Sequence, residues 1–290
     1  MKTSIKVSIV RSFTHNPNQG NPAGVVIDGH SFSDQKIVQV AAKLGYSESV
    51  FVRPSSRADV KVIFSSPTRL INLCGHGTVA AFHAWIAGQP DFFSKERVVS
   101  KTMETWRGDI LQILCHSNGK IEMFQKQTEY GATAFDPAEV ARLLRLRKED
   151  ICHQLPIQMV STGTPKLIIP LKDRDRLFQI HPDFPEIARF CEKHDCYGFY
   201  PFYQTNHPDF DAEARQFNPR MGIDEDPVTG VAAAALGAYL CAHRKLKKDQ
   251  MIVRQGYHMN RGGEIYVTVG QPMKIGGYAV TEKVMGICVF

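Results

Sequence analysis

Long hydrophobic runs are absent from this sequence of 290 residues. The longest charge-free apolar stretch with a helical pattern runs from Gly230 to Ala242, well short of the ~18 to 20 residues that a membrane-spanning helix needs. Near the N-terminus Ile5, Val7 and Ile9 alternate with polar residues, which predicts a half-buried strand and not the apolar core of a signal peptide. A cytoplasmic protein with no membrane partner is therefore expected.

Cysteine pairs of the kind that hold disulfide frameworks or thiolate metal sites are also lacking. The seven cysteines are odd in number and contain no Cys-x-x-Cys pair, so we expect free thiols and no metal. Strong charge of one sign is missing as well, since 35 Lys plus Arg are interleaved with 29 Asp plus Glu. This mixture is typical of a solvated surface and argues against a nucleic-acid partner.

Two segments stand out because they are apolar on every side. A loop ending in Leu73 to Thr78 opens the segment from Val79 to Ala87, and a loop ending in Asp226 to Gly230 opens the segment from Val231 to Ala242. A helix that is hydrophobic all round must be covered all round. Both segments are therefore predicted to be central, buried helices.

The elements around these helices occur twice in the same order. A helix from Ser33 to Leu44 precedes strands and the first apolar segment, and helical residues near Asp183 to Cys191 precede strands and the second. The offsets agree, with 150 residues from Ser33 to Asp183 and 155 from Cys74 to Thr229. We expect an α+β fold of two pseudo-symmetric domains, each a mostly antiparallel sheet wrapped around a central helix. The first would contain residues 1–125 and the C-terminal strand 277–290, the second residues 126–276, and a cleft would lie between them.

The starts of the two central helices are candidate ligand sites. Each helix opens in a glycine-containing loop and presents unpaired backbone N–H groups at the positive end of its dipole. Two such ends facing one cleft would bind an anion. Taken one loop at a time, Gly75, Gly77 and Gly230 need only permit tight turns; the matched positions favour a ligand site.

Three titratable residues are candidates for proton transfer: Glu48, His76 and Asp226. Glu48 stands among aromatic and branched residues, where the pKa of a carboxylate can rise toward neutrality, so that it accepts and returns a proton. Each residue also has an ordinary interpretation. Glu48 can be a solvated edge charge, His76 a hydrogen-bonding loop residue, and Asp226 a turn residue before Pro227.

Five sequence blocks span nearly the whole chain in a fixed order. They are Gly20 to Val25 after Phe13, Ser47 to Ser49, Leu73 to His76, Gly222 to Gly230, and Gln255-Gly256 with Arg261. In this combination the chain resembles the PhzF-like family, named for the phenazine-biosynthesis isomerase, within the diaminopimelate-epimerase-like fold.

The resemblance implies two similar domains, no cofactor, a small carboxylate substrate and commonly a homodimer. It implies that Glu48 is the base that removes a carbon-bound proton and redelivers it, while His76 and Asp226 orient the substrate and steer protonation. Gly75 and the turn at Thr229 and Gly230 would supply backbone donors to the substrate carboxylate. Asn21, from the first block, and Gly77, directly after the third, complete the set of expected substrate contacts.

Two alternatives to a proton-shifting isomerase are open. Racemases of this fold use paired cysteines at the matched helix starts, but here the mate of Cys74 is Thr229, whose hydroxyl is a poor proton donor. A non-catalytic binding or scaffold protein is the other alternative. It is suggested by Leu70, where many family members have Glu, and by Val231, where a small hydroxyl residue is frequent.

Overall fold

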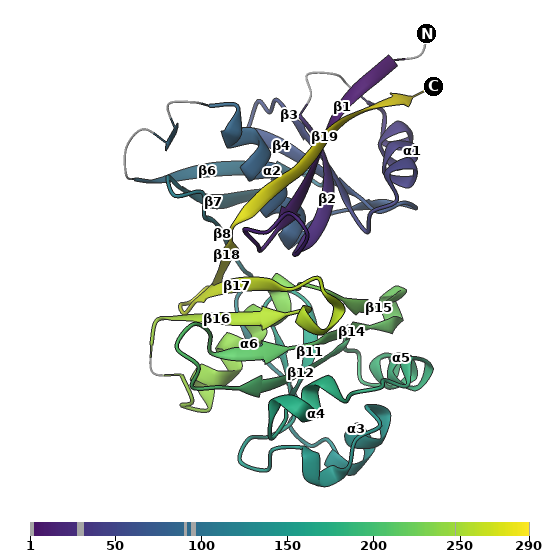
Figure 1. The fold of residues 1–290 in the computed structure, drawn as a ribbon, viewed down its shortest axis with the longest axis vertical. Helices are drawn as coiled ribbons and strands as arrows, with labels where there is room; N and C mark the ends of the chain where they lie inside the picture. The colour runs from purple at the N-terminus through teal and green to yellow at the C-terminus, as the bar shows by residue number, and fades with distance from the viewer. Residues whose placement is uncertain (1–2, 28–31, 90–91, 94–96, 247, 290) are drawn as a thin grey trace. The chain divides into compact units, whose positions relative to one another are not determined.

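The computed structural model describes residues 3–27, 32–89, 92–93, 97–246 and 248–289. The chain divides into two compact units, of which unit 1 contains Met1–Phe124 and Gly276–Phe290 and unit 2 contains Gln125–Ile275. Each unit combines a sheet with a few helices (Figure 1), which confirms the expected α+β fold class. Within the described ranges, no helix is long and apolar enough to cross a membrane.

The sheet of unit 1 has the strand order β19, β1, β2, β3, β4, β6, β7, β8, with β5 paired to β4. Its neighbours are antiparallel except for the pairs β2–β3 and β4–β6. Strands β1 and β19 run side by side, so the two ends of the chain meet in this unit (Figure 1). The strands are β1 (Thr3–Ser12), β2 (Asn21–Ile27), β3 (Ser49–Arg53), β4 (Val60–Ser65), β5 (Leu70–Ile71), β6 (Val98–Thr105), β7 (Ile110–His116), β8 (Ile121–Phe124) and β19 (Ala279–Val289).

Helix α2 (Gly75–Ala87) lies inside this sheet and contacts β1, β2, β3, β4, β8 and β19. Helix α1 (Asp34–Leu44) covers the other face, where Ile37 and Val40 pack against Val7, Phe51 and other strand residues. The first apolar segment was thus correctly predicted as a buried helix, but the helix begins at Gly75 and not at Val79. The glycines suggested a loop, yet Cys74 caps the first turn and burial outweighs their poor helix propensity.

The sheet of unit 2 has the strand order β9, β10, β11, β12, β13, β16, β17. Strands β14 and β15 extend it from β12, and only the pairs β11–β12 and β13–β16 are parallel among those described. The strands are β9 (Glu129–Tyr130), β10 (Gln158–Ser161), β11 (Pro165–Pro170), β12 (Phe199–Gln204), β13 (Ala212–Ala214), β14 (Gln216–Asn218), β15 (Ile223–Asp226), β16 (Gln250–Gln255) and β17 (Gly263–Thr268), and β18 (Lys274–Gly277) leads back to unit 1.

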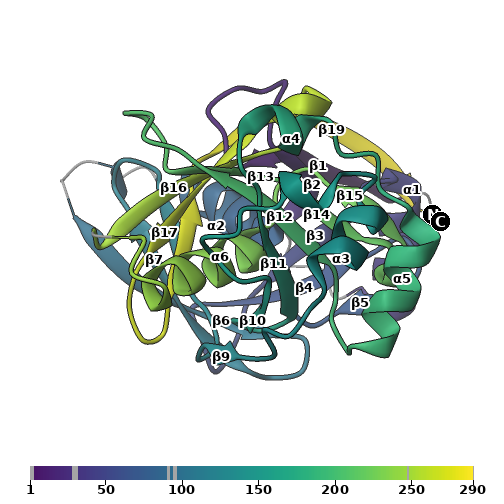
Figure 2. The same cartoon turned by 90° about the horizontal axis from the view of Figure 1, so that it is seen from below.

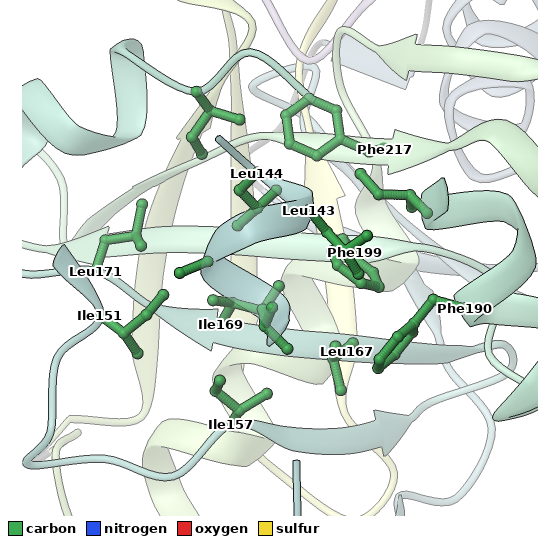
Figure 3. Close-up of a cluster of buried hydrophobic side chains, with 14 of the residues drawn as sticks. Leu143, Leu144, Ile151, Ile157, Leu167, Ile169, Leu171, Phe190, Phe199 and Phe217 are labelled. Atoms are coloured by element: carbon green, nitrogen blue, oxygen red, sulfur yellow. The ribbon is translucent and has the colours of Figure 1, made fainter. Parts of the chain in front are cut away.

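Helix α6 (Gly230–Ala242) lies inside the sheet of unit 2, against β10, β11 and β17 (Figure 2). The outer face of the sheet is covered by α3 (Pro137–Leu143), α4 (Arg174–Phe178) and α5 (Phe184–Lys193). Figure 3 shows Leu143 and Phe190 from these helices packed against Leu167, Ile169 and Phe199 of the strands. Both faces of β11 are therefore buried, and its alternate residues, among them Lys166, point toward the α6 side.

The predicted internal repeat is present in the element order. The order of elements in unit 1 is β1, β2, α1, β3, β4, β5, α2, β6, β7, β8. Apart from the additional helix α4, unit 2 repeats this order from β10 onward as β10, β11, α5, β12, β13 with β14, β15, α6, β16, β17, β18. The matched outer helices are capped alike, since the side chains of Ser33 and Asp183 accept hydrogen bonds from the N–H groups of Lys36 and Glu186. Matched positions of the two units can therefore be compared residue by residue.

Candidate active site

Glu48 and His76 meet at the start of α2 in unit 1. Glu48 directly precedes β3, and His76 lies in the first turn of the helix. The Glu48 Oε2 atom is 3.3 Å from His76 Nε2, and the two side chains are 15% and 8% exposed. The carboxylate is thus held against the imidazole while keeping limited access to solvent.

The His76 ring is fixed by residues at the ends of β1 and β2. Asn21 Nδ2 lies 3.3 Å from His76 Nδ1, and the Ser12 hydroxyl donates to the His76 carbonyl oxygen at 2.7 Å. With the Asn21 amide as donor, Nδ1 is the acceptor and Nε2 carries the proton that faces Glu48. The Nε2–H group therefore serves as a hydrogen-bond donor that orients the carboxylate.

Cys74 is the N-cap of α2 and lies beside the same imidazole. Its Sγ is 3.4 Å from His76 Nδ1 and 3.8 Å from Nε2, and it accepts a hydrogen bond from the Gly77 N–H at 3.3 Å. A Cβ on Gly77 would come within 3.0 Å of the Phe64 ring and 3.1 Å of this sulfur, so the close approach requires glycine. The Gly77 N–H, expected to contact substrate, is thus directed at Cys74, whereas Gly75 presents its N–H at the helix start.

The second group of predicted residues lies at the start of α6 in unit 2. Asp226 ends β15, and Thr229 is the N-cap of α6, directly before Gly230. The Thr229 hydroxyl donates to Asp226 Oδ2 at 2.5 Å. Because this hydroxyl occupies the position that matches the Cys74 thiol, unit 2 has no thiol at its helix start.

Gln255 belongs to one of the five sequence blocks but had no predicted role of its own, and it holds this second loop together. Its Nε2 donates to the Asp226 carbonyl oxygen at 2.7 Å and to the Thr229 hydroxyl at 3.2 Å. Its Oε1 accepts from the Thr229 N–H at 3.2 Å and from the Tyr200 hydroxyl at 3.1 Å. Burial, with the nearby charge of Asp226, raises the pKa of Tyr200 far above its usual range, so the phenol stays a neutral donor.

Lys166 is a second residue that the sequence analysis missed. It lies on β11 with 4% of its surface exposed, and its Nζ donates to Asn218 Oδ1 at 2.9 Å. Burial lowers the pKa of Lys166 to about 8, against the opposing effect of the Asp226 carboxylate. A lone lysine in the apolar run Pro165–Pro170 was the available sequence signal.

At matched positions the two units share the residues that anchor the central helix but differ in the residues that could react. Thr162 Oγ1 donates to the Val231 carbonyl oxygen at 3.0 Å, as Ser12 does to that of His76, so one strand-end hydroxyl anchors each central helix. Gly198 directly precedes β12, as Glu48 precedes β3. A Cβ at Gly198 would lie 2.2 Å from Asn218 Oδ1 and from the Phe217 carbonyl oxygen, at a φ of +148°. Unit 2 therefore has no room for a carboxylate at the position of Glu48.

A cavity in unit 2 is lined by none of the residues described above. It measures about 370 Å³ and is lined by Arg174, Glu213, Arg254 and several aromatic side chains. Arg174 pairs with Glu213 at 2.7 Å, and Arg254 with Glu264 at 2.8 Å. Each of these two arginines therefore already has a carboxylate partner within the protein.

The two-unit fold, with one wrapped helix in each unit, is the epimerase-like fold. A hydroxyproline epimerase from Agrobacterium vitis has this fold, with a TM-score of 0.61 at 12% identity over 99% of this chain and 92% of its own. The chain belongs to the PhzC-PhzF family of phenazine biosynthesis-like proteins, whose model matches residues 10–284.

Individual relatives agree with this membership. The solved structure of a phenazine biosynthesis protein of the PhzF family from Bacillus anthracis is 30% identical, with a TM-score of 0.88, over 99% of this chain and 100% of its own. The uncharacterized isomerase YddE of Escherichia coli K12 is 33% identical over 92% of each chain. Trans-2,3-dihydro-3-hydroxyanthranilate isomerase of Pseudomonas aeruginosa is 27% identical over 89% of this chain and 88% of its own. The enzyme class given by these relatives is isomerase.

Proposed function

We propose that this protein is a cofactor-independent isomerase that moves a carbon-bound proton on a small carboxylate substrate, with Glu48 as the base. The observation that carries the proposal is the contact between Glu48 and His76 at the start of α2. A carboxylate so placed has an acceptor oxygen for the substrate proton and a hydrogen-bond donor that fixes its orientation.

The matched positions support a single base. Glu48 has no carboxylate counterpart, because Gly198 occupies the corresponding place in unit 2. One carboxylate suffices when the proton leaves and returns on the same face of the substrate. Racemization instead requires an acid and a base on opposite faces, and Thr229 replaces the second thiol that such a mechanism would use.

The start of α2 suits the charge that develops during proton removal. Removing a proton next to an unsaturated or carboxyl-bearing carbon generates negative charge. The N–H groups of Gly75 and His76 belong to the first turn of α2, where the helix dipole favours an anion. We therefore assign the Gly75 N–H to bind the substrate. His76 is assigned two contacts, one with Glu48 and one with the substrate.

The loop from Asp226 to Gly230 is assigned to the same reaction because it precedes α6 as the loop with Cys74 precedes α2. Asp226, with Thr229 and Gly230, would steer protonation and contact the substrate carboxylate. Gln255 holds the Asp226 backbone and the Thr229 N–H in place, which gives the loop a fixed geometry. Two residues that differ from the usual family pattern bear on which acid is the substrate. Val231 has no hydroxyl group to bind it, and Leu70 packs as a hydrophobic residue against the cluster around Ile37.

The test is isotope exchange in deuterated water. A panel of small unsaturated acids, including trans-2,3-dihydro-3-hydroxyanthranilate, is incubated with the protein and followed by NMR for deuterium uptake or a shifted double bond. Glu48→Gln should lower turnover by about 100-fold to 10,000-fold, since it removes the base but keeps the shape. Glu192→Gln, at an exposed glutamate of α5, is the matched control and should retain full activity.

Other outcomes point to the alternatives. Full turnover in Glu48→Gln would remove Glu48 as the base. Loss of optical rotation in a chiral acid, abolished in Cys74→Ala, would instead indicate a racemase. Absence of exchange with every acid, together with a stable protein partner, would favour a scaffold. A homodimer is part of the proposal and is checked by light scattering of the purified chain.

A further inference from the structure

Three different metal-binding atoms converge at the start of α2. A Glu48 carboxylate oxygen, the Cys74 sulfur and a His76 ring nitrogen all lie within 4.8 Å of one another. Cys74 and His76 are close together in the sequence, whereas Glu48 is distant in the sequence and is brought beside them by the fold. We infer that these three side chains form a binding site for a borderline-soft divalent transition-metal ion, of which Zn²⁺ is the representative.

The spacing of the donor atoms fits such an ion. Zinc bonds of about 2.0 to 2.3 Å in a tetrahedral arrangement separate neighbouring ligand atoms by about 3.3 to 3.7 Å. His76 Nε2 is 3.3 Å from Glu48 Oε2 and 3.8 Å from Cys74 Sγ. Because the Cys74 sulfur lies nearer to His76 Nδ1, at 3.4 Å, than to Nε2, the imidazole has to turn before one of its nitrogens shares an ion with both other ligands.

The chemistry of the donors selects the class of ion. Thiolate and imidazole ligands suit zinc and its neighbours in the first transition series, whereas magnesium and calcium require oxygen ligands. Bound to the ion as a thiolate, Cys74 keeps the hydrogen bond that its sulfur accepts from the Gly77 N–H, 3.3 Å away. Together with Glu48 it would neutralize the two positive charges of the ion.

Surrounding residues complete the site. Ligation through Nε2 places the ring proton of His76 on Nδ1, where Asn21, at 3.3 Å, can accept it with its oxygen after rotation of the amide. The three ligands are between 8% and 15% exposed, which leaves an open side for a water molecule as fourth ligand. Three protein ligands with one open position make a metal site that exchanges with solvent.

The ion would act as an inhibitor. It would occupy the Glu48 oxygen and the His76 nitrogen that the proposed isomerization needs, so Zn²⁺ and substrate would exclude each other. This part of the inference rests on the proposed function, whereas metal binding itself does not.

Binding is measured first on the purified full chain, without any substrate. Competition with a chromogenic zinc chelator should give one tight Zn²⁺ site per chain, weakened on the order of 100-fold or more in Cys74→Ser. Cys288→Ser, at an exposed cysteine of β19, is the matched control and should leave the affinity unchanged. Co²⁺ should produce a thiolate charge-transfer band that Cys74→Ser abolishes, and Mg²⁺ should not compete.

The proposed metal site would be wrong if Cys74→Ser bound zinc as tightly as the wild type. It would also be wrong if the Co²⁺ complex lacked the thiolate band. The activity assay separates the two proposals. Tight zinc binding by a protein without isomerase activity would contradict the proposed function alone. Full activity with zinc bound at Cys74 would contradict the inhibitory role.

Discussion

Replacing Gln255 by Leu removes the side chain that holds the first turn of α6 in place. Gln255 is 1% exposed and makes hydrogen bonds to Asp226, Thr229 and Tyr200. Leucine is close to glutamine in size and can hydrogen-bond with none of these groups. The substitution therefore isolates the polar role of Gln255 from its volume.

The expected cost follows from the bonds that are lost. Four hydrogen bonds, two to Thr229 and one each to Asp226 and Tyr200, disappear together. At about 1 kcal/mol net for each, the free energy of unfolding of unit 2 should fall by about 4 kcal/mol. The hydroxyl of Tyr200, which is 0% exposed, is then left without Gln255 as its acceptor.

A double-mutant cycle in urea unfolding tests this reasoning. Tyr200→Phe alone should cost about 1 kcal/mol, but in the Gln255→Leu background it should be neutral or stabilizing, because it removes a buried hydroxyl that has lost its acceptor. Gln35→Leu, at an exposed position of α1, is the control and should change stability by less than about 0.5 kcal/mol. A loss below about 1 kcal/mol in Gln255→Leu, or simple additivity with Tyr200→Phe, would refute the assigned role.

Two further predictions concern buried positions of unit 2. Gly198→Ala should destabilize the protein by about 3 kcal/mol or more, since its Cβ meets two oxygen atoms at 2.2 Å, whereas Gly119→Ala, also at positive φ but in open space, should cost about 1 to 2 kcal/mol. Equal losses in the two variants, measured by urea unfolding, would exclude the steric argument. Lys166 has a pKa of about 8 when folded and near 10.5 when unfolded, so the unfolded chain binds more protons between these pH values and stability rises with pH across them. This rise, up to about 3 kcal/mol, should be missing in Lys166→Met, and parallel pH profiles of the two proteins would contradict it.

Local signals were enough to predict much of the fold. Ser33 was identified as a helix start because a capping side chain acts on N–H groups two or three residues away, and the helix predicted near Asp183 has that residue as its N-cap in the structure. The two apolar segments were identified as central helices because no amphipathic pattern could place them at a surface. The start of α2 was placed four residues too late, because a sulfur cap and burial allow glycines within a first turn that propensity alone assigns to a loop.

The sequence by itself determined which chemical groups are available: one glutamate before β3, a Cys-Gly-His block, and Thr229 in place of a second cysteine. Tertiary structure decided what these groups contact. Glu48 and His76 lie 28 positions apart in the chain, and only the pairing of β2 with β3 around α2 brings their side chains to 3.3 Å. In the same way Gln255 holds the second loop only because the fold brings the end of β16 to the residues that precede α6. Hydrogen bonds and ion pairs act over a few ångströms in space, and distance along the sequence does not reveal which residues the fold will bring that close.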